Sequence, residues 1–165
     1  KAAALELLSL TENDEYRNLY EKYINDSSYS VSGAALQGLA GIDKDYAYTI
    51  AKKLSGDAKG NLSDAINSVI LEKGDVSDFD NILKSYEDMP TSQTKLEFTS
   101  TFCGFLTKLN DSEKIKQGID EVISFRNEIP EKYRSFTDPE LQQYLQSAIE
   151  GKESSLQSYI NEAFK

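Results

Sequence analysis

The sequence contains no histidine and a single cysteine, and these two shortages remove much of the chemistry that proteins perform at neutral pH. Histidine is the most common general base and zinc ligand, and one cysteine cannot form a thiolate cage. Cys103 stands in the apolar run Phe102–Leu106 and has no basic neighbour, so we expect a small buried hydrophobe there, not a reactive thiol. We predict no catalytic, cofactor-binding or metal-binding residue in this chain.

Positive charge is also scarce. Asp and Glu number 28 against 18 Lys and Arg, a net charge of -10, which repels nucleic acid and anionic membrane surfaces. No apolar run approaches the length of about 18 residues that a membrane-spanning helix needs. We therefore expect neither nucleic acid nor a membrane as partner.

Because the chain opens in helical register at Lys1, without an initiator Met or a capping residue, we also expect a fragment of a longer protein.

What the sequence does contain is a helical pattern that repeats about every 30 residues. A small residue, a branched apolar residue and another apolar residue three positions later recur at offsets of 31 and 30 residues. The three occurrences are Ala4-Leu5-Leu8, Ala35-Leu36-Leu39 and Ala65-Ile66-Val69. A second run with the 3.6-residue spacing of a one-faced helix follows each of them. These second runs are Tyr16, Leu19, Tyr20, Tyr23 and Ile24, then Tyr46, Ile50 and Leu54, then Phe79, Leu83 and Tyr86.

Short polar segments separate the two helices of each pair. Gly41 and Gly74 predict helix ends, whereas Asn13, Asp43 and Ser77 predict N-caps of the helices that follow.

After Pro90 the helices become longer and less regular. One runs from Leu96 to Leu109 and the next ends at Ile129-Pro130. Thr137-Asp138-Pro139-Glu140 predicts the start of another helix with Pro139 at its first position, and a last helix follows Gly151. We predict an all-α fold of stacked antiparallel helix pairs with nine or ten helices. It would be a single domain of five units, at about residues 1–29, 30–60, 61–90, 91–130 and 131–165.

The helix around Gly33 and Gly38 is rich in small residues, and each interior glycine costs it about 1 kcal/mol. We expect close approach of a neighbouring helix to compensate for this cost, in preference to a ligand-binding backbone.

The clustered tyrosines are expected to fill the space between helix layers, although a sugar or peptide groove is the alternative. They are Tyr16, Tyr20, Tyr23, Tyr46 and Tyr48.

Several other patterns in the sequence are either incomplete ligand-binding motifs or charged residues with a structural explanation. Residues 57–61 look superficially like a calcium loop, but the alternating oxygen ligands are missing and position twelve is Ser68, not Glu. Gly56 to Gly60 is not a phosphate loop, since no Gly-Lys-Ser/Thr follows. The carboxylate pairs Asp43/Asp45, Asp75/Asp78 and Glu87/Asp88 are expected to serve helix N-termini. The three arginines, Arg17, Arg126 and Arg134, are candidates for carboxylate recognition or for surface ion pairs.

Two segments carry a resemblance to a known family. Residues 26–40, with Ala34-Ala35-Leu36, and residues 46–54, ending in Lys52-Lys53-Leu54, are similar to the C-terminal HEAT-like region of bacterial zinc aminopeptidases of the aminopeptidase N family. The likeness covers about residues 1–90. It implies a HEAT-like α-α superhelix. The family's His-Glu-x-x-His zinc motif and its Gly-x-Met-Glu-Asn substrate loop do not occur here, so no functional residue of the family is carried onto this chain.

The resemblance implies a non-catalytic C-terminal helical domain of a zinc aminopeptidase, a hydrolase whose zinc lies in the catalytic domain of the parent. Such a domain packs on that catalytic domain and shapes the access of peptide substrates. One alternative is a HEAT-like scaffold that binds a protein segment and has no relation to peptidases. Another is an enzyme that uses carboxylates and tyrosines, which would require a deep pocket joining two carboxylates across helices.

Overall fold

A computed structural model of the chain describes residues 1–56 and 58–164, which form ten α-helices and two short 3-10 helices and contain no strand. The predicted all-α fold with nine or ten helices is thereby confirmed. Contacts within the chain divide it into two compact units, Lys1–Gly74 (unit 1) and Asp75–Lys165 (unit 2). The arrangement as a single domain of five units stays a prediction.

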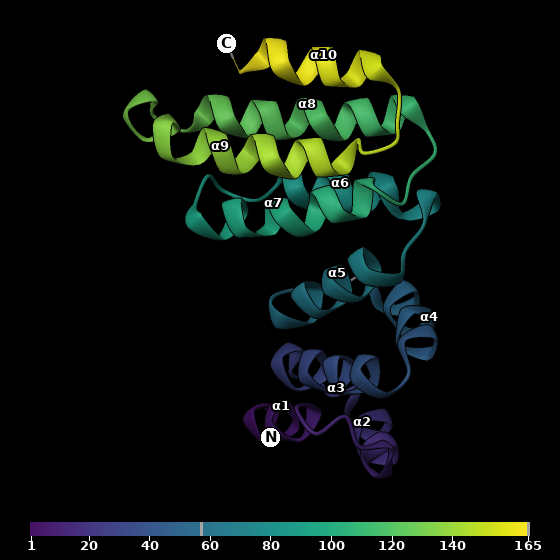
Figure 1. Cartoon of the computed structure of the whole chain (residues 1–165). Helices are drawn as coiled ribbons and strands as arrows, with labels where there is room; N and C mark the ends of the chain where they lie inside the picture. Colours follow the sequence, from purple (N-terminus) through teal and green to yellow (C-terminus); the bar gives the residue numbers. More distant parts are fainter. Residues whose placement is uncertain (57, 165) are drawn as a thin grey trace. The chain divides into compact units, whose positions relative to one another are not determined.

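Unit 1 is built as two layers of helices. Helices α1, α3 and α5 pack one upon another, and α2 and α4 lie beside them against α3 and α5 (Figure 1). α3 lies at the centre and contacts all four of the others. The elements are α1 (Ala2–Ser9), η1 (Asp14–Tyr16), α2 (Arg17–Tyr23), α3 (Tyr29–Ile42), α4 (Lys44–Leu54) and α5 (Asn61–Lys73).

The small residues of α3 let its neighbours approach closely, as the sequence predicts. A Cβ atom on Gly33 would lie 2.6 Å from the carbonyl oxygen of Asn61 in α5. A Cβ atom on Gly38 would lie 2.3 Å from Cε1 in the buried ring of Tyr20 in α2. The backbone of α3 therefore takes the space that side chains would otherwise fill, and the packing gained offsets the low helix propensity of glycine.

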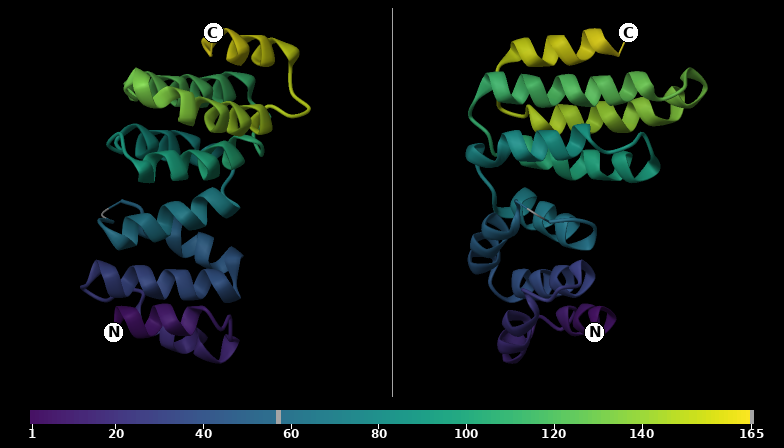
Figure 2. Two further views of the ribbon diagram at one scale, coloured as in Figure 1. Left: turned by 60° about the vertical axis from the view of Figure 1, so that its left-hand side comes forward. Right: turned by 180° about the vertical axis from the view of Figure 1, so that it is seen from behind.

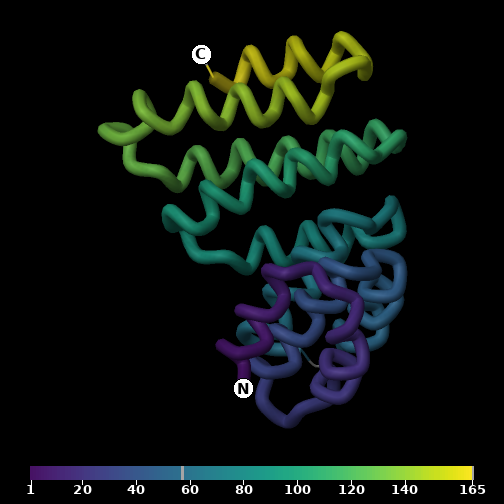
Figure 3. The backbone as a smooth tube through the Cα atoms, turned by 60° about the horizontal axis from the view of Figure 1, so that its bottom comes forward, coloured from purple at the N-terminus to yellow at the C-terminus, as the bar shows by residue number. Residues whose placement is uncertain are grey.

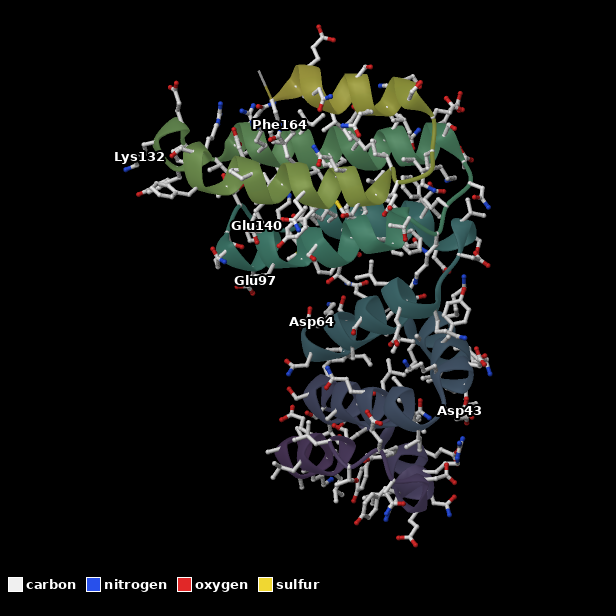
Figure 4. The ribbon with its side chains drawn as sticks, viewed as in Figure 1. Asp43, Asp64, Glu97, Lys132, Glu140 and Phe164 are labelled. Atoms are coloured by element: carbon white, nitrogen blue, oxygen red, sulfur yellow. The ribbon has the colours of Figure 1, made fainter. Side chains whose placement is uncertain are left out.

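The turn between α3 and α4 is a single residue. Asp43 caps α4 by accepting a hydrogen bond from the backbone N–H of Tyr46 at 3.0 Å, as predicted (Figure 4). Asn13 likewise caps η1. The helix end predicted at Gly41 is wrong, since α3 continues to Ile42. Gly41 is exposed and interior to the helix because the capping Asp43 lies two positions later and sets the boundary. The stop at Gly74 is confirmed as the C-cap of α5.

Unit 2 contains the two longest helices of the described residues, α8 and α9, and its helices lie side by side (Figures 2 and 3). α9 packs against α7, α8 and α10, and α8 also contacts α6, α7 and α10. The elements are η2 (Val76–Asp78), α6 (Phe79–Glu87), α7 (Gln93–Leu106), α8 (Ser112–Glu128), α9 (Glu131–Ala148) and α10 (Ser154–Ala163). α8 ends just before Ile129-Pro130, as predicted.

Aromatic rings fill the centre of unit 2. The ring of Tyr86 stacks on that of Phe102 with centroids 4.5 Å apart and meets the edge of Phe125 at 6.3 Å. All three side chains are buried. Stacked and edge-to-face rings at these separations attract one another beyond the apolar area they bury. They join α6, α7 and α8 into one core.

The helix start predicted at Thr137-Asp138-Pro139 is wrong. α9 begins eight residues earlier, at Glu131, and continues through Pro139. Proline has no N–H, so the carbonyl of Ser135 loses its helical partner. A contact distant in sequence supports the helix at this point: the guanidinium of Arg126 in α8 binds Asp138 through two hydrogen bonds.

The N-cap predicted at Ser77 is also displaced. The capping residue is Asp75, whose carboxylate accepts from the N–H of Ser77 at 2.8 Å, while the buried carboxylate of Asp78 accepts from the N–H of Asp75 at 3.1 Å. This reciprocal pair is a capping box. It forms two residues earlier than the sequence suggests because a short 3-10 turn precedes α6.

Candidate binding surfaces

The three arginines, which were candidates for recognition of carboxylates, bind groups of the chain itself. Arg17 lies 3.1 Å from both Asp14 and Asp43 in unit 1. Arg134 donates to the backbone carbonyls of Ile129 and Asn127 at 2.9 and 2.8 Å, at the end of α8. These contacts favour the interpretation as internal ion pairs and helix-end contacts over recognition of an external carboxylate.

Arg126 has the richest set of partners. Its Nε and Nη2 atoms donate to the two carboxylate oxygens of Asp138 at 2.9 and 2.6 Å. Its Nη1 atom donates to the carbonyl oxygen of Ala163 at 3.2 Å, and the guanidinium lies 4.8 Å from the ring centre of Phe164, which Figure 4 shows between α10 and α8. Arg126 thus ties α9 and the end of α10 to α8.

The paired carboxylates mostly serve helix starts, as predicted. Asp43 caps α4, and hydrogen bonding from the N–H of Tyr46, followed by that from Arg17, lowers the pKa of its carboxyl. Asp75 and Asp78 form the capping box of η2. The prediction is wrong for Glu87/Asp88, because these residues lie at the C-terminal end of α6.

The tyrosines of unit 1 differ in burial. Tyr20 is buried against Gly38, and burial raises the pKa of its hydroxyl. The other four tyrosines of the predicted cluster are half-buried, and Tyr29 is exposed. The predicted role between helix layers is therefore confirmed for Tyr20. Cys103 is buried as expected, and burial raises the pKa of its thiol to about 12.

A buried lysine in unit 2 was not singled out from the sequence. The side chain of Lys95 donates to the carbonyl oxygen of Met89 at 3.1 Å and lies 4.8 Å from the ring centre of Tyr86. The hydroxyl of Tyr86 donates to Thr99 at 2.8 Å, and that of Thr99 donates to the carbonyl of Lys95 at 2.7 Å. The sequence did carry a signal, since Lys95, Thr99 and Phe102 are spaced four and three residues apart on the face of α7 that also carries the buried apolar residues.

Glu121 is the carboxylate most affected by this environment. Burial raises its pKa above the usual value, and the negative charge of Glu87 raises it further. The positive charge of Lys95 acts in the opposite direction.

An apolar hollow of about 340 Å³ lies among α7, α8 and α9. Its lining comes from segments far apart in sequence and consists of Thr91, Ser92, Gln93, Leu96, Phe125, Ile129, Pro130, Tyr133 and Thr137. Two of the polar side chains at this hollow bind carboxylates: the hydroxyl of Thr91 donates to Glu128, and the amide of Gln93 donates to Glu97 at 3.2 Å. The hollow has the size and lining to accept one aliphatic or aromatic side chain.

A second hollow, of about 430 Å³, is polar and lies between the end of α9 and the start of α10. Glu150 and Glu153 both line it, but they belong to the same turn of the chain and are three residues apart. Two carboxylates placed in this way do not face one another across helices, which a general acid/base pair would require.

Across residues 1–56 and 58–164 no three His, Cys, Asp or Glu side chains gather closely enough to hold a metal ion. In the same part of the chain no helix has the length and apolar character needed to cross a bilayer. Asp57, the first residue of the calcium-like segment, lies outside the described residues.

No family model, curated protein or solved structure significantly matches the chain.

Proposed function

We propose that this chain is a non-catalytic helical domain of a zinc aminopeptidase, that it packs on the catalytic domain of that protein, and that it shapes the access of peptide substrates. Zinc and the reacting groups would belong to the catalytic domain.

The observation that carries the proposal is the place of the resembling residues in the fold. Residues 26–54 form one helix pair, α3 and α4, joined by the capping residue Asp43. Ala34, Ala35 and Leu36, by which this segment resembles the family, are buried, and the neighbouring Gly33 and Gly38 lie where α3 meets α5 and α2. Because the resemblance coincides with a structural unit and with its packing surfaces, it concerns the architecture of the domain and not an isolated string of residues.

The first test separates this chain from its parent. The 165-residue chain and the protein encoded by its whole reading frame are purified with zinc, and each is assayed with aminoacyl-p-nitroanilide substrates. We expect chelator-sensitive cleavage by the whole protein and none by the chain alone. Zinc-dependent cleavage by the isolated chain, or inactivity of the whole protein toward every aminoacyl substrate, would contradict the proposal.

The second test concerns access. A whole protein in which the apolar hollow is altered by Tyr133→Ala is compared with one carrying Tyr29→Ala, an exposed aromatic of unit 1. If the domain shapes peptide entry through unit 2, the first variant changes kcat/KM for a long peptide relative to a dipeptide, and the second does not. If this ratio of kcat/KM values is the same in the two variants, unit 2 is excluded as the surface that controls access.

The apolar hollow also supports a second candidate function, a scaffold that binds a protein segment. Tyr133 at its edge is 51% exposed, and Phe136, one turn further along α9, is 78% exposed. Exposed aromatics beside a preformed apolar hollow are typical of sites that bind a partner's side chain. A discrete partner unrelated to peptidases, bound by the purified chain and lost on Tyr133→Ala, would favour this function.

A further inference from the structure

The outer face of α1 differs from the outer faces of other helices in unit 1. Leu7 is 68% exposed and Leu10 is 80% exposed, and both lie in helical backbone at the end of α1. Ala3 is four residues before Leu7, so Ala3, Leu7 and Leu10 follow one helical stripe. The opposite face of α1, which carries the buried Leu5, packs on α3.

The repeat shows what this stripe corresponds to one unit later. At the offset of 31 residues, Ala3 and Leu7 become Ala34 and Gly38 of α3. Ala34 is 2% exposed, and Gly38 is buried against the ring of Tyr20, which belongs to the preceding helix pair. Ala3 and Leu7 thus correspond to buried positions of α3, one of which packs on the preceding helix pair, whereas Leu10 corresponds to the exposed Gly41. Two of the three stripe positions therefore match an interface that the fold already contains.

The helix α10 provides an internal comparison. Apart from Tyr159, which is 37% exposed and donates to Asp120 through its hydroxyl, its exposed positions are polar, as expected of a helix face that contacts water. They include Ser154, Ser155, Ser158, Asn161 and Glu162. The exposed positions of α1 and its C-cap include Ala3, Ala4, Leu7 and Leu10 in place of such residues. α10 therefore has the composition of a capping helix, and α1 has the composition of an interior one.

We propose that the outer face of α1 is a stacking surface, and that its occupant is another helix pair of the same repeat type, with an apolar face that has a hollow or small residue opposite Leu7. Leu7 stands where α3 has Gly38, so the occupant cannot place a large ring there as Tyr20 does. This inference concerns packing alone and holds whether or not the whole protein is a peptidase.

The test uses thiol labelling of the protein encoded by the whole reading frame and of the 165-residue chain. Leu7→Cys is compared with Ser158→Cys on the polar face of α10, and the buried Cys103 is present in both. We expect N-ethylmaleimide to modify the thiol at position 7 at least about tenfold more slowly in the whole protein than in the chain, because a packed helix pair must open before reagent enters. The rate at position 158 should change less than about twofold.

A photo-reactive maleimide attached through Leu7→Cys in the whole protein then identifies the occupant by mass spectrometry of the cross-linked peptide. We expect a segment with two consecutive one-faced helical patterns in the same polypeptide. Equal labelling rates at position 7 in the two proteins would overturn the proposal. So would a cross-link to a strand or loop, or protection that rises with protein concentration, which would indicate a second copy of the chain.

A charged variant keeps the proposal testable if the cysteine variant folds poorly. Leu7→Lys combined with Leu10→Lys should leave the Tm of the 165-residue chain nearly unchanged, because both side chains are exposed there. In the whole protein it should lower Tm by at least about 2 °C, since two charges would be buried. An equal Tm change in the two proteins would contradict the stacking surface.

Discussion

Units 1 and 2 are both helical, but they fill the space between helices in opposite ways. In unit 1 the seams contain glycine and alanine, so that the backbone of α3 lies directly against Asn61 and the ring of Tyr20. In unit 2 the seams contain aromatic rings, with Tyr86 and Phe102 stacked at 4.5 Å. A seam, that is, an interface between helices, has no room for added atoms where it lacks side chains. A seam made of rings loses the most free energy of unfolding when atoms are removed.

The largest effect should come from removing a ring in unit 2. Phe102 is fully buried between Tyr86 and the other helices of the core, so Phe102→Ala should lower the free energy of unfolding by about 3–5 kcal/mol. Urea unfolding followed by circular dichroism measures this loss. Phe136→Ala, at a ring that is 78% exposed, is the control and should stay within about 0.5 kcal/mol of the unaltered chain. Similar losses in the two variants would contradict the view that buried rings stabilise unit 2.

The next effect comes from adding one methyl group to unit 1. Gly33→Ala would place Cβ 2.6 Å from a backbone oxygen of α5, and backbone cannot move aside as a flexible side chain can. We expect a loss of about 1–3 kcal/mol. The matched control is Gly104→Ala in α7, where no atom lies within 4 Å of the added Cβ. There the better helix propensity of alanine should raise stability by about 0.5–1 kcal/mol.

Opposite signs in these two glycine variants would confirm that the seams of unit 1 depend on the absence of side chains. A stabilising Gly33→Ala would mean that α3 and α5 can separate without cost, and the account of unit 1 would be wrong.

The helices themselves were predictable because their apolar residues keep the 3.6-residue period over whole helices, from Ala4-Leu5-Leu8 onward. The capping role of Asp43 was predictable for a similar reason: the side chain bonds a backbone group three residues away. Features of this kind depend on neighbours in sequence, so local patterns were sufficient.

The wrong predictions concern features that are determined by a contact between residues distant in sequence or by a short intervening turn. Pro139 predicts a helix start, but α9 continues through it. Arg126, twelve residues from Asp138 in the sequence, binds that carboxylate and supports this region of α9. The apolar hollow brings together residues between Thr91 and Thr137, which no local pattern relates. Lys95 was not predicted as buried, although its helical spacing from Thr99 and Phe102 places it on the buried face of α7.

Alkaline pH should affect the core of unit 2 through Cys103. Its pKa in the folded chain is raised to about 12, whereas an unfolded thiol has a pKa of about 8.5. The folded state holds this proton more tightly, so the stability it contributes is present below the unfolded pKa and is lost as pH rises from about 8.5 toward 12. At pH 10, about 1.5 units above the unfolded pKa, we expect the loss to be about 2 kcal/mol.

The measurement is the free energy of unfolding in urea at pH 7 and pH 10, for the chain and for Cys103→Ala. The variant should be less stable at pH 7 because of its cavity, but its loss between the two pH values should be smaller. Burial also raises the pKa of Tyr86 in both proteins, and the charge of Cys103 adds to this rise only in the unaltered chain. Parallel pH dependences would show that the thiol ionises without opening the core.

The smallest effect concerns unit 1 at acid pH. The pKa of Asp43 is lowered first by the N–H of Tyr46 and then by Arg17, so its contribution is present above the unfolded carboxyl pKa and is lost as pH falls below that value toward the folded one. Asp43→Asn keeps the cap, because asparagine also accepts from the helix N–H groups, but removes the charge that Arg17 binds. Unfolding curves at pH 7 and pH 3 should therefore differ less for this variant than for Asp64→Asn, at an exposed carboxylate of α5. If both variants keep the full acid dependence, the pairing of Asp43 with Arg17 contributes nothing to unit 1, and its stability depends on the small-residue seams alone.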